Sequence, residues 1–215
     1  MTYLNLVNNV LRRLREDQVT TVYANTYSTM IGDFINDAKG IIETSWDWSQ
    51  LRRTVNVSTL SGLHTYSLIG TKDYGKILTI MNDTADMLME YRPQSWVDEK
   101  YTLGAAADGI PTFYTYNGVD PAGDSQIDVY PRPDDTYVLK AKMVIREGLL
   151  EVDADLLSIP SQPVIHLALA LASRERGETG GTSTPEYFAI ADKYLSDAIA
   201  MDAQKHPDET IWFTP

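Results

Sequence analysis

The sequence contains no cysteine, so neither disulfide bonds nor thiolate metal sites can hold this fold together. This fits assembly in a reducing cytoplasm. Long apolar runs are also missing: the longest, PVIHLALALA, is too short to span a bilayer and contains His166. The charges near the N-terminus follow the apolar residues instead of preceding them, so we expect no signal peptide and no membrane partner.

Basic residues are scarce, with 18 Lys and Arg against 30 Asp and Glu, which gives a net charge of -12. The imbalance grows along the chain: residues 1–60 carry no net charge, residues 61–150 carry -5 and residues 151–215 carry -7. A chain this acidic repels the phosphates of nucleic acid. The composition therefore argues against a protein that grips DNA.

The N-terminal part of the sequence shows two patterns that predict helices. The first has Thr2 available as N-cap and places Leu6, Val7, Val10, Leu11 and Leu14 on one stripe. The second has apolar residues at three- and four-residue steps, namely Met30, Ile31, Phe34, Ile35, Ala38, Ile41 and Ile42. It ends near SWDWSQ, where Trp46 and Trp48 can lie over the helix end as core or interface anchors.

From about Arg52 the hydrophobic period changes from 3.6 to 2, which is typical of strands. TVNVSTLSGLHTYSL predicts a hairpin that turns at Ser61–Gly62. KILTIMND and MLMEY predict two further strands, GIPTFYTYNG an aromatic-rich one, and QIDVYPRPDDTYVLKAKMVI a second hairpin with Asp134 and Asp135 at its turn. The middle of the chain is therefore predicted to be an antiparallel β unit.

Helical periodicity returns after Pro160. QPVIHLALALASRER is apolar on nearly all sides, which predicts a buried helix, and Thr184 with Pro185 predicts the start of a last helix that Pro207 ends. The predicted fold class is α+β: a helical bundle formed by the N- and C-terminal helices, with an inserted antiparallel β domain. The predicted parts are the N-terminal helices at 1–51, the β domain at 52–150, the C-terminal helices at 151–206 and a tail at 207–215.

No motif predicts catalysis, a cofactor or a metal site. Asp134 and Asp135 are adjacent at a turn and would flank no substrate, whereas a catalytic acid pair needs a shared pocket. His64, His166 and His206 show no ligand spacing, and the glycine-rich stretch 177–182 has no following lysine. The acidic segments at Asp120 and Asp153 lack the glycine and glutamate of a calcium loop. There is also no GxSxG.

Several motifs occur in a particular order: SWDW at the end of the second helix, then IPTFYTYNG, then IDVYPRPDDTYVLKAKMVI, then DLLSIPSQPVIHLALALASRERG before the last helix. In this order the chain resembles the head-to-tail adaptor (head-completion or connector) proteins of tailed phages. The resemblance covers most of the chain. It implies a structural virion protein and not an enzyme.

The resemblance also implies partners and a location. Such adaptors assemble, usually as twelve copies, into a ring beneath the portal protein, where they extend the DNA channel and present a docking surface to the tail protein. The expected location is the head–tail junction of the virion, after assembly in the host cytoplasm. DNA would pass through without specific binding. The acidity fits such a channel, and equally a surface that only confers solubility.

The C-terminal tail carries the one candidate interaction site. Ile211, Trp212 and Phe213 follow the helix stop, and such adaptors often reach the portal with their C-termini. We expect these three residues to contact the portal or a neighbouring subunit, as large aromatic anchors do. Alternatively the tail folds back on its own domain.

Two other functions stay open at this point. One is a hydrolase acting on cell-wall glycans, which would need two carboxyl groups facing each other across a cleft. The other is a monomeric soluble binding domain.

Overall fold

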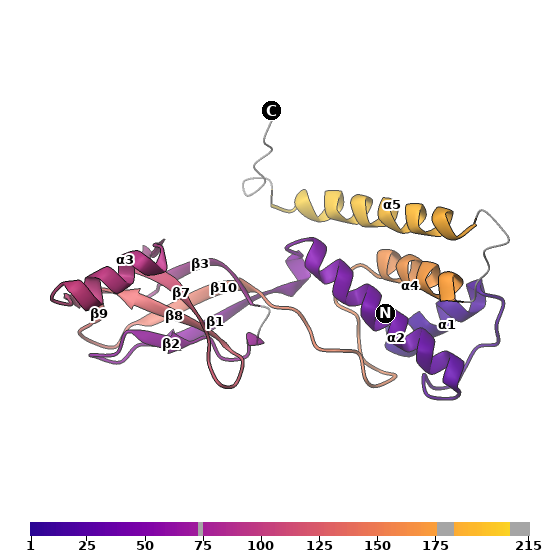
Figure 1. Cartoon of the computed structure of the whole chain (residues 1–215), viewed down its shortest axis with the longest axis horizontal. Helices are drawn as coiled ribbons and strands as arrows, with labels where there is room; N and C mark the ends of the chain where they lie inside the picture. Colours follow the sequence, from indigo (N-terminus) through magenta and orange to yellow (C-terminus); the bar gives the residue numbers. More distant parts are fainter. Residues whose placement is uncertain (73–74, 176–182, 207–215) are drawn as a thin grey trace, which may run out of the picture. The chain divides into compact units, whose positions relative to one another are not determined.

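The computed structural model describes residues 1–72, 75–175 and 183–206. The chain divides into two compact units: Met1–Leu51 with Glu147–Pro215, here called the helical unit, and Arg52–Arg146, here called the β unit (Figure 1). Helices dominate the first unit and strands the second. The predicted α+β class is therefore confirmed.

The helical unit contains α1 (Tyr3–Arg13), α2 (Thr26–Ser45), the short η1 (Ser49–Leu51), α4 (Ser161–Glu175) and α5 (Ser183–Ala203). Thr2 caps α1 as predicted, since its hydroxyl accepts the amide of Asn5 at 3.3 Å. Asn25 and Ser28 form a reciprocal capping box at the start of α2. α5 begins one residue before the predicted cap, and Pro185 still lies in the first turn, where its missing N–H costs no helical bond.

α4 is the centre of the helical unit, because it contacts α1, α2 and α5 (Figure 1). Buried residues occur on most sides of it, as its sequence predicted: Pro163, Val164, Ile165, His166, Ala168, Leu169, Ala170, Ala172 and Ser173. Trp48 is fully buried, and its indole nitrogen donates to the carbonyl of Ile42 at 2.8 Å, over the end of α2. This confirms Trp48 as a core anchor.

Two four-stranded sheets form the β unit (Figure 1). The first has the order β1 (Arg52–Ser58), β10 (Val138–Val144), β3 (Lys76–Asn82) and β4 (Met87–Leu88). The second has the order β2 (Thr65–Ser67), β8 (Ser125–Tyr130), β7 (Phe113–Val119) and β5 (Glu90–Tyr91). One hydrophobic core takes side chains from both sheets, including Ile80, Leu139, Met143, Tyr114 and Ile127.

Short elements complete the β unit. β6 (Asp108–Gly109) pairs with β9 (Arg132–Pro133), and α3 (Gln94–Asp98) continues into a π-helical turn, η3 (Glu99–Leu103). The β5–β7 and β6–β9 pairs are parallel. The expectation of a purely antiparallel domain is therefore wrong at these two short pairs.

Both predicted hairpins are wrong. The strands on either side of Ser61–Gly62 do not pair with each other: β1 pairs with β10, and β2 pairs with β8. Likewise β8 and β10, on either side of Asp134 and Asp135, belong to different sheets. The chain crosses from one sheet to the other at both places. The alternating pattern did predict the buried faces correctly, because Ile127, Val129, Leu139, Ala141 and Met143 all lie in the core.

Candidate functional site

The acid pair Asp134 and Asp135 lies in an exposed loop between β9 and β10. One oxygen of Asp134 accepts the hydroxyl of Tyr137 at 2.7 Å, and this hydrogen bond raises the pKa of Tyr137 to about 12. Asp135 accepts the amide of Thr136 at 2.7 Å. Each carboxylate thus bonds to its own loop, as a turn residue does. The pair shapes a loop between sheets and not the turn of a hairpin.

The three histidines lie in different surroundings. His64 stacks on Tyr101 in the β unit, with ring centroids 4.4 Å apart. His166 is buried on α4, where it stacks on Tyr194 of α5 at 4.3 Å and lies 3.0 Å from the guanidinium of Arg13. Burial and the charge of Arg13 lower the pKa of His166, so the ring is neutral and its Nε2 accepts from Arg13. His166 joins three helices and has the environment of a core histidine.

The aspartates of the two acidic segments accept hydrogen bonds from backbone amides. Asp120 accepts the amides of Ala122 and Asp124, and the hydrogen bond from Asp124 is the main reason that its pKa is lowered. Asp153 accepts the amide of Val22 at 2.9 Å. Within residues 1–72, 75–175 and 183–206, no group of three or more His, Asp or Glu side chains could hold a metal ion.

The candidate anchor Ile211, Trp212 and Phe213 lies outside the described residues, and so does the glycine-rich stretch 177–182. Docking of Ile211, Trp212 and Phe213 on a partner is therefore a proposal.

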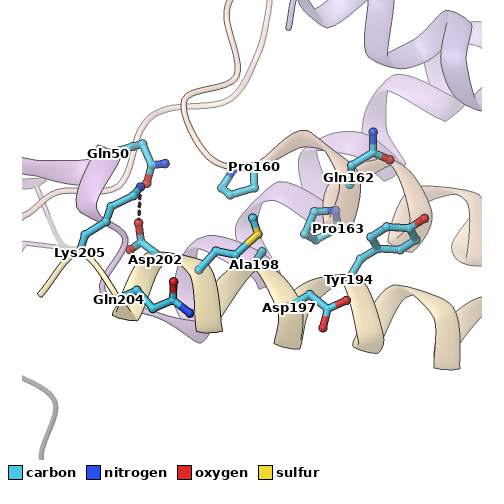
Figure 2. A pocket seen from close by; sticks show the side chains of 11 residues that line it. Gln50, Pro160, Gln162, Pro163, Tyr194, Asp197, Ala198, Asp202, Gln204 and Lys205 are labelled. Carbon is cyan, nitrogen blue, oxygen red and sulfur yellow. Dashed lines mark hydrogen bonds and ion pairs between the residues drawn. The ribbon is translucent and has the colours of Figure 1, made fainter. Parts of the chain in front are cut away.

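An apolar groove of about 680 Å³ runs along α5 in the helical unit (Figure 2). Its walls come from α5, from the start of α4 and from Gln50. The other lining residues are Pro160, Gln162, Pro163, Tyr194, Asp197, Ala198, Met201, Asp202, Gln204 and Lys205. Met201 is 65% exposed and Tyr194 39% exposed. Large apolar side chains that stay in water along a groove are typical of a surface that binds another polypeptide.

Asp202 fixes the C-terminal end of α5 beside this groove. It is buried, and its carboxylate accepts four hydrogen bonds, from the amide and hydroxyl of Ser49, the indole of Trp46 and the amine of Lys205, at 2.8–3.2 Å. Burial alone would raise the pKa of Asp202, but the hydrogen bonds from Lys205 and Ser49 together lower it below its ordinary value. Asp202 is therefore ionised and tied to the segment that follows α2.

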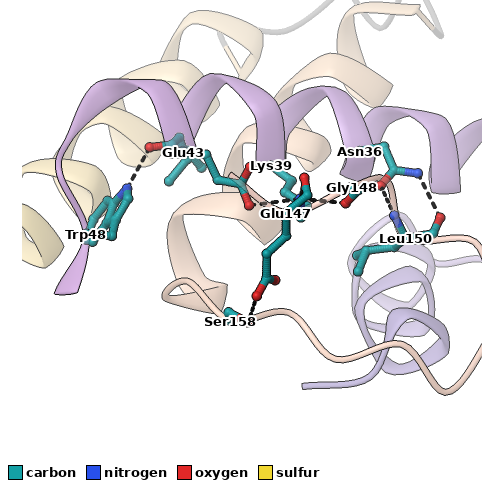
Figure 3. A network of polar contacts seen from close by, with 9 residues as sticks. Asn36, Lys39, Glu43, Trp48, Glu147, Gly148, Leu150 and Ser158 are labelled. Carbon is teal, nitrogen blue, oxygen red and sulfur yellow. Dashed lines mark hydrogen bonds and ion pairs between the residues drawn. The ribbon is translucent and has the colours of Figure 1, made fainter. Parts of the chain in front are cut away.

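A second buried polar network lies on α2 (Figure 3). Lys39, only 2% exposed, donates to the carbonyls of Glu147 and Gly148 at 3.0 and 2.9 Å and pairs with Glu43 at 2.8 Å. Asn36 brackets Leu150, donating to its carbonyl at 3.1 Å and accepting its amide at 2.9 Å. Through these bonds α2 holds residues 147–150 in place, where the chain returns to the helical unit.

Sequence reasoning missed both networks. A signal for the second one exists, because Lys39 and Glu43 are adjacent to apolar positions of the α2 stripe, where a charged side chain needs a buried partner. No such signal marks Asp202, since its partners Trp46 and Ser49 are far away in sequence.

None of the helices in the described part of the chain combines the length and the apolar character that crossing a membrane requires. The described residues instead offer a groove with exposed apolar side chains, and polar networks whose charged groups are occupied by structural bonds. A groove with exposed apolar side chains is typical of a surface that contacts other molecules.

The sequence matches the SU10 adaptor protein family over residues 1–210, so the chain belongs to this family. No curated protein matches it. The family assignment confirms the resemblance to phage head-to-tail adaptors. The chain is thus a phage structural adaptor, a component of the virion that interacts with other head or tail proteins.

Proposed function

We propose that this chain forms a ring at the head–tail junction, joins the portal protein to the tail protein and extends the DNA channel. The observation that carries the proposal is the family match, which covers residues 1–210 and so includes both units. A ring of about twelve copies, assembled in the host cytoplasm, follows from what such adaptors do. Head-to-tail contacts between identical subunits close into a ring when the rotation between them allows it.

The contacts of the helical unit support a helical bundle with an inserted β domain. We take the N-terminal helices at 1–51 and the C-terminal helices at 151–206 as one bundle, into which the β domain at 52–150 is inserted. Its support is that α4, which follows the β unit in sequence, contacts α1 and α2, which precede it. The Lys39 network holds the returning chain to α2. Such anchoring lets an inserted domain present its surface without loosening the bundle.

The charge of the chain supports passage of DNA without specific binding. A net charge of -12 disfavours close contact with phosphates, so a channel lined by such subunits would not hold the genome back. The same acidity gives no support to a membrane partner, and no cofactor is needed for this function.

The tail is the proposed anchor. Ile211, Trp212 and Phe213 would dock on the portal or on a neighbouring subunit, where aromatic residues contribute most of the binding energy of an interface. Replacing all three with serine should abolish retention of the adaptor on portal rings. Retention equal to that of the unchanged chain would refute the anchor.

A structural role fits the observed acids better than the hydrolase alternative. Asp197 and Asp202 both line the groove, but the lowered pKa of Asp202 makes it a poor general acid, and its four hydrogen bonds are all to structural groups. No observation favours a monomeric binding domain over the adaptor.

Quantitative mass spectrometry of purified virions tests the proposed function. The adaptor should be present in particles at about the same copy number as the portal protein. A chain that is abundant in infected cells but absent from purified particles would contradict the proposal.

A further inference from the structure

The apolar groove on α5 lies along one continuous face of that helix. Ile190, Tyr194 and Met201 project from this face at helical spacing and are 40%, 39% and 65% exposed in the part of the chain that the structure describes. Figure 2 shows Tyr194, Ala198 and the lysine at the far end, Lys205, along the same side of α5, opposite Pro160 and Pro163. The groove thus has an apolar floor and leads directly to the end of the helix.

The chain itself supplies a segment that begins at this end. The described residues stop at His206, immediately after Gln204 and Lys205, which line the groove. The remaining sequence is PDETIWFTP. Proline is favoured at the second position of a type I turn, and aspartate is common in turns. His206-Pro207-Asp208-Glu209 is therefore a favourable sequence for reversing the chain.

A reversal here would bring the aromatic residues to the groove. An extended chain advances about 3.3 Å per residue, whereas α5 rises about 1.5 Å per residue. Trp212 follows Glu209 by three residues, so it would reach roughly 10 Å back along the helix. That distance places it level with the helix between Ala198 and Met201, the apolar middle of the groove.

The chemistry of the segment matches the lining in the same order. Asp208 and Glu209 would stay at the end of the groove, near the amine of Lys205. Beyond Glu209 the tail has no charged side chain, so no charge would have to be buried against Met201, Pro160 or Pro163. Ile211, Trp212 and Phe213 are the apolar cluster that the groove would then cover.

We propose that in the unassembled subunit this groove holds the tail of the same chain, with Ile211, Trp212 and Phe213 against α5. A tethered segment has an effective concentration on the order of millimolar, so it outcompetes the tail of a second copy at ordinary protein concentrations. The inference goes beyond the proposed function, because it concerns the free subunit. In the free subunit the groove would cover the apolar cluster until a portal or a neighbouring subunit binds these three residues.

The absence of cysteine makes a disulfide test straightforward. We would combine Thr214→Cys with Ala198→Cys in the groove, and in a matched control with Ser196→Cys, an exposed position on the same helix that does not line the groove. Both pairs close loops of similar length, so loop-closure entropy does not distinguish them. Mild oxidation of dilute, monomeric full-length protein is followed by non-reducing gels and intact mass.

The groove pair should form an intramolecular disulfide at least tenfold faster than the control pair, and Trp212→Ser should remove this advantage. Equal rates for the two pairs would overturn the inference, as would covalent dimers in place of cross-linked monomers, which would assign the groove to a second copy. Circular dichroism of the reduced variants checks the fold; should Ala198→Cys disturb it, Met201→Cys replaces it, at a more exposed position. The outcome is independent of ring formation, so failure of the proposed function would leave it unaffected.

Discussion

Replacing Asp202 with alanine is the sharpest test of how the groove is built. Asp202 is 3% exposed and accepts hydrogen bonds from Ser49, Trp46 and Lys205. Alanine leaves the amide of Ser49 and the indole of Trp46 without this acceptor. Both donors are partly buried, so each should cost an amount in the lower half of the range of about 1–3 kcal/mol for a buried donor. The bond to Lys205, whose side chain is 51% exposed, adds at most about 1 kcal/mol.

We therefore expect Asp202→Ala to lower the free energy of unfolding by about 3–4 kcal/mol, and the melting temperature by about 10 °C. Asp202→Asn keeps one acceptor oxygen but points an amide donor at other donors, so it should fall between alanine and the unchanged chain. The measurement is urea unfolding followed by far-ultraviolet circular dichroism, with the slope checked for constancy. Asp197→Ala, at an exposed position on the same helix, is the control and should change stability by less than about 0.5 kcal/mol.

The effect should also depend on pH with a definite sign. Because the folded-state pKa of Asp202 is lowered, its contribution is complete above the ordinary aspartate pKa and is lost as the pH falls below about 4. The stability difference between Asp202→Ala and the unchanged chain should narrow there. If Asp202→Ala is no less stable than Asp197→Ala near neutral pH, the hydrogen-bond account of α5 is wrong.

Three further changes test other parts of the structure. Since the folded-state pKa of His166 is lowered, its contribution to stability should be complete above about pH 6.5 and decline below it, and urea midpoints should show a smaller decline for His166→Phe. Lys39→Met removes the ion-pair partner of the buried Glu43 and should lower the free energy of unfolding by about 3–5 kcal/mol in urea unfolding. The double variant Lys39→Met with Glu43→Leu should lose less stability, and equal losses in the two variants would contradict a buried ion pair. Asp134→Asn combined with Asp135→Asn should change the free energy of unfolding, measured by urea unfolding, by less than about 0.5 kcal/mol and leave assembly intact. Loss of a measured hydrolytic activity while the fold is preserved would contradict the structural interpretation.

The helices were predictable because their signals are local. Thr2 as a cap and the stripe of Leu6, Val7, Val10 and Leu11 depend on neighbours within a few residues, and the structure buries all four apolar side chains. Strand faces were predictable for the same reason.

The pairing partners of the strands were not predictable, because an alternating pattern shows which residues face the core but does not show which strand lies alongside. The serine-glycine and double-aspartate turns suggested hairpins, whereas β10 pairs with β1 and β3 in the first sheet and β8 pairs with β2 and β7 in the second. The groove beside Asp202 depends on Ser49 and Pro160, whose approach to α5 is a tertiary event. No local pattern in the last helix could predict it.

The central claim is that this chain is a ring-forming adaptor, and native mass spectrometry of the full-length protein mixed with portal rings tests it most directly. The account predicts a complex in which about twelve adaptor chains are bound to each portal ring, with few partly filled rings. Persistent monomeric adaptor at high concentration, alongside unoccupied portal rings, would contradict it.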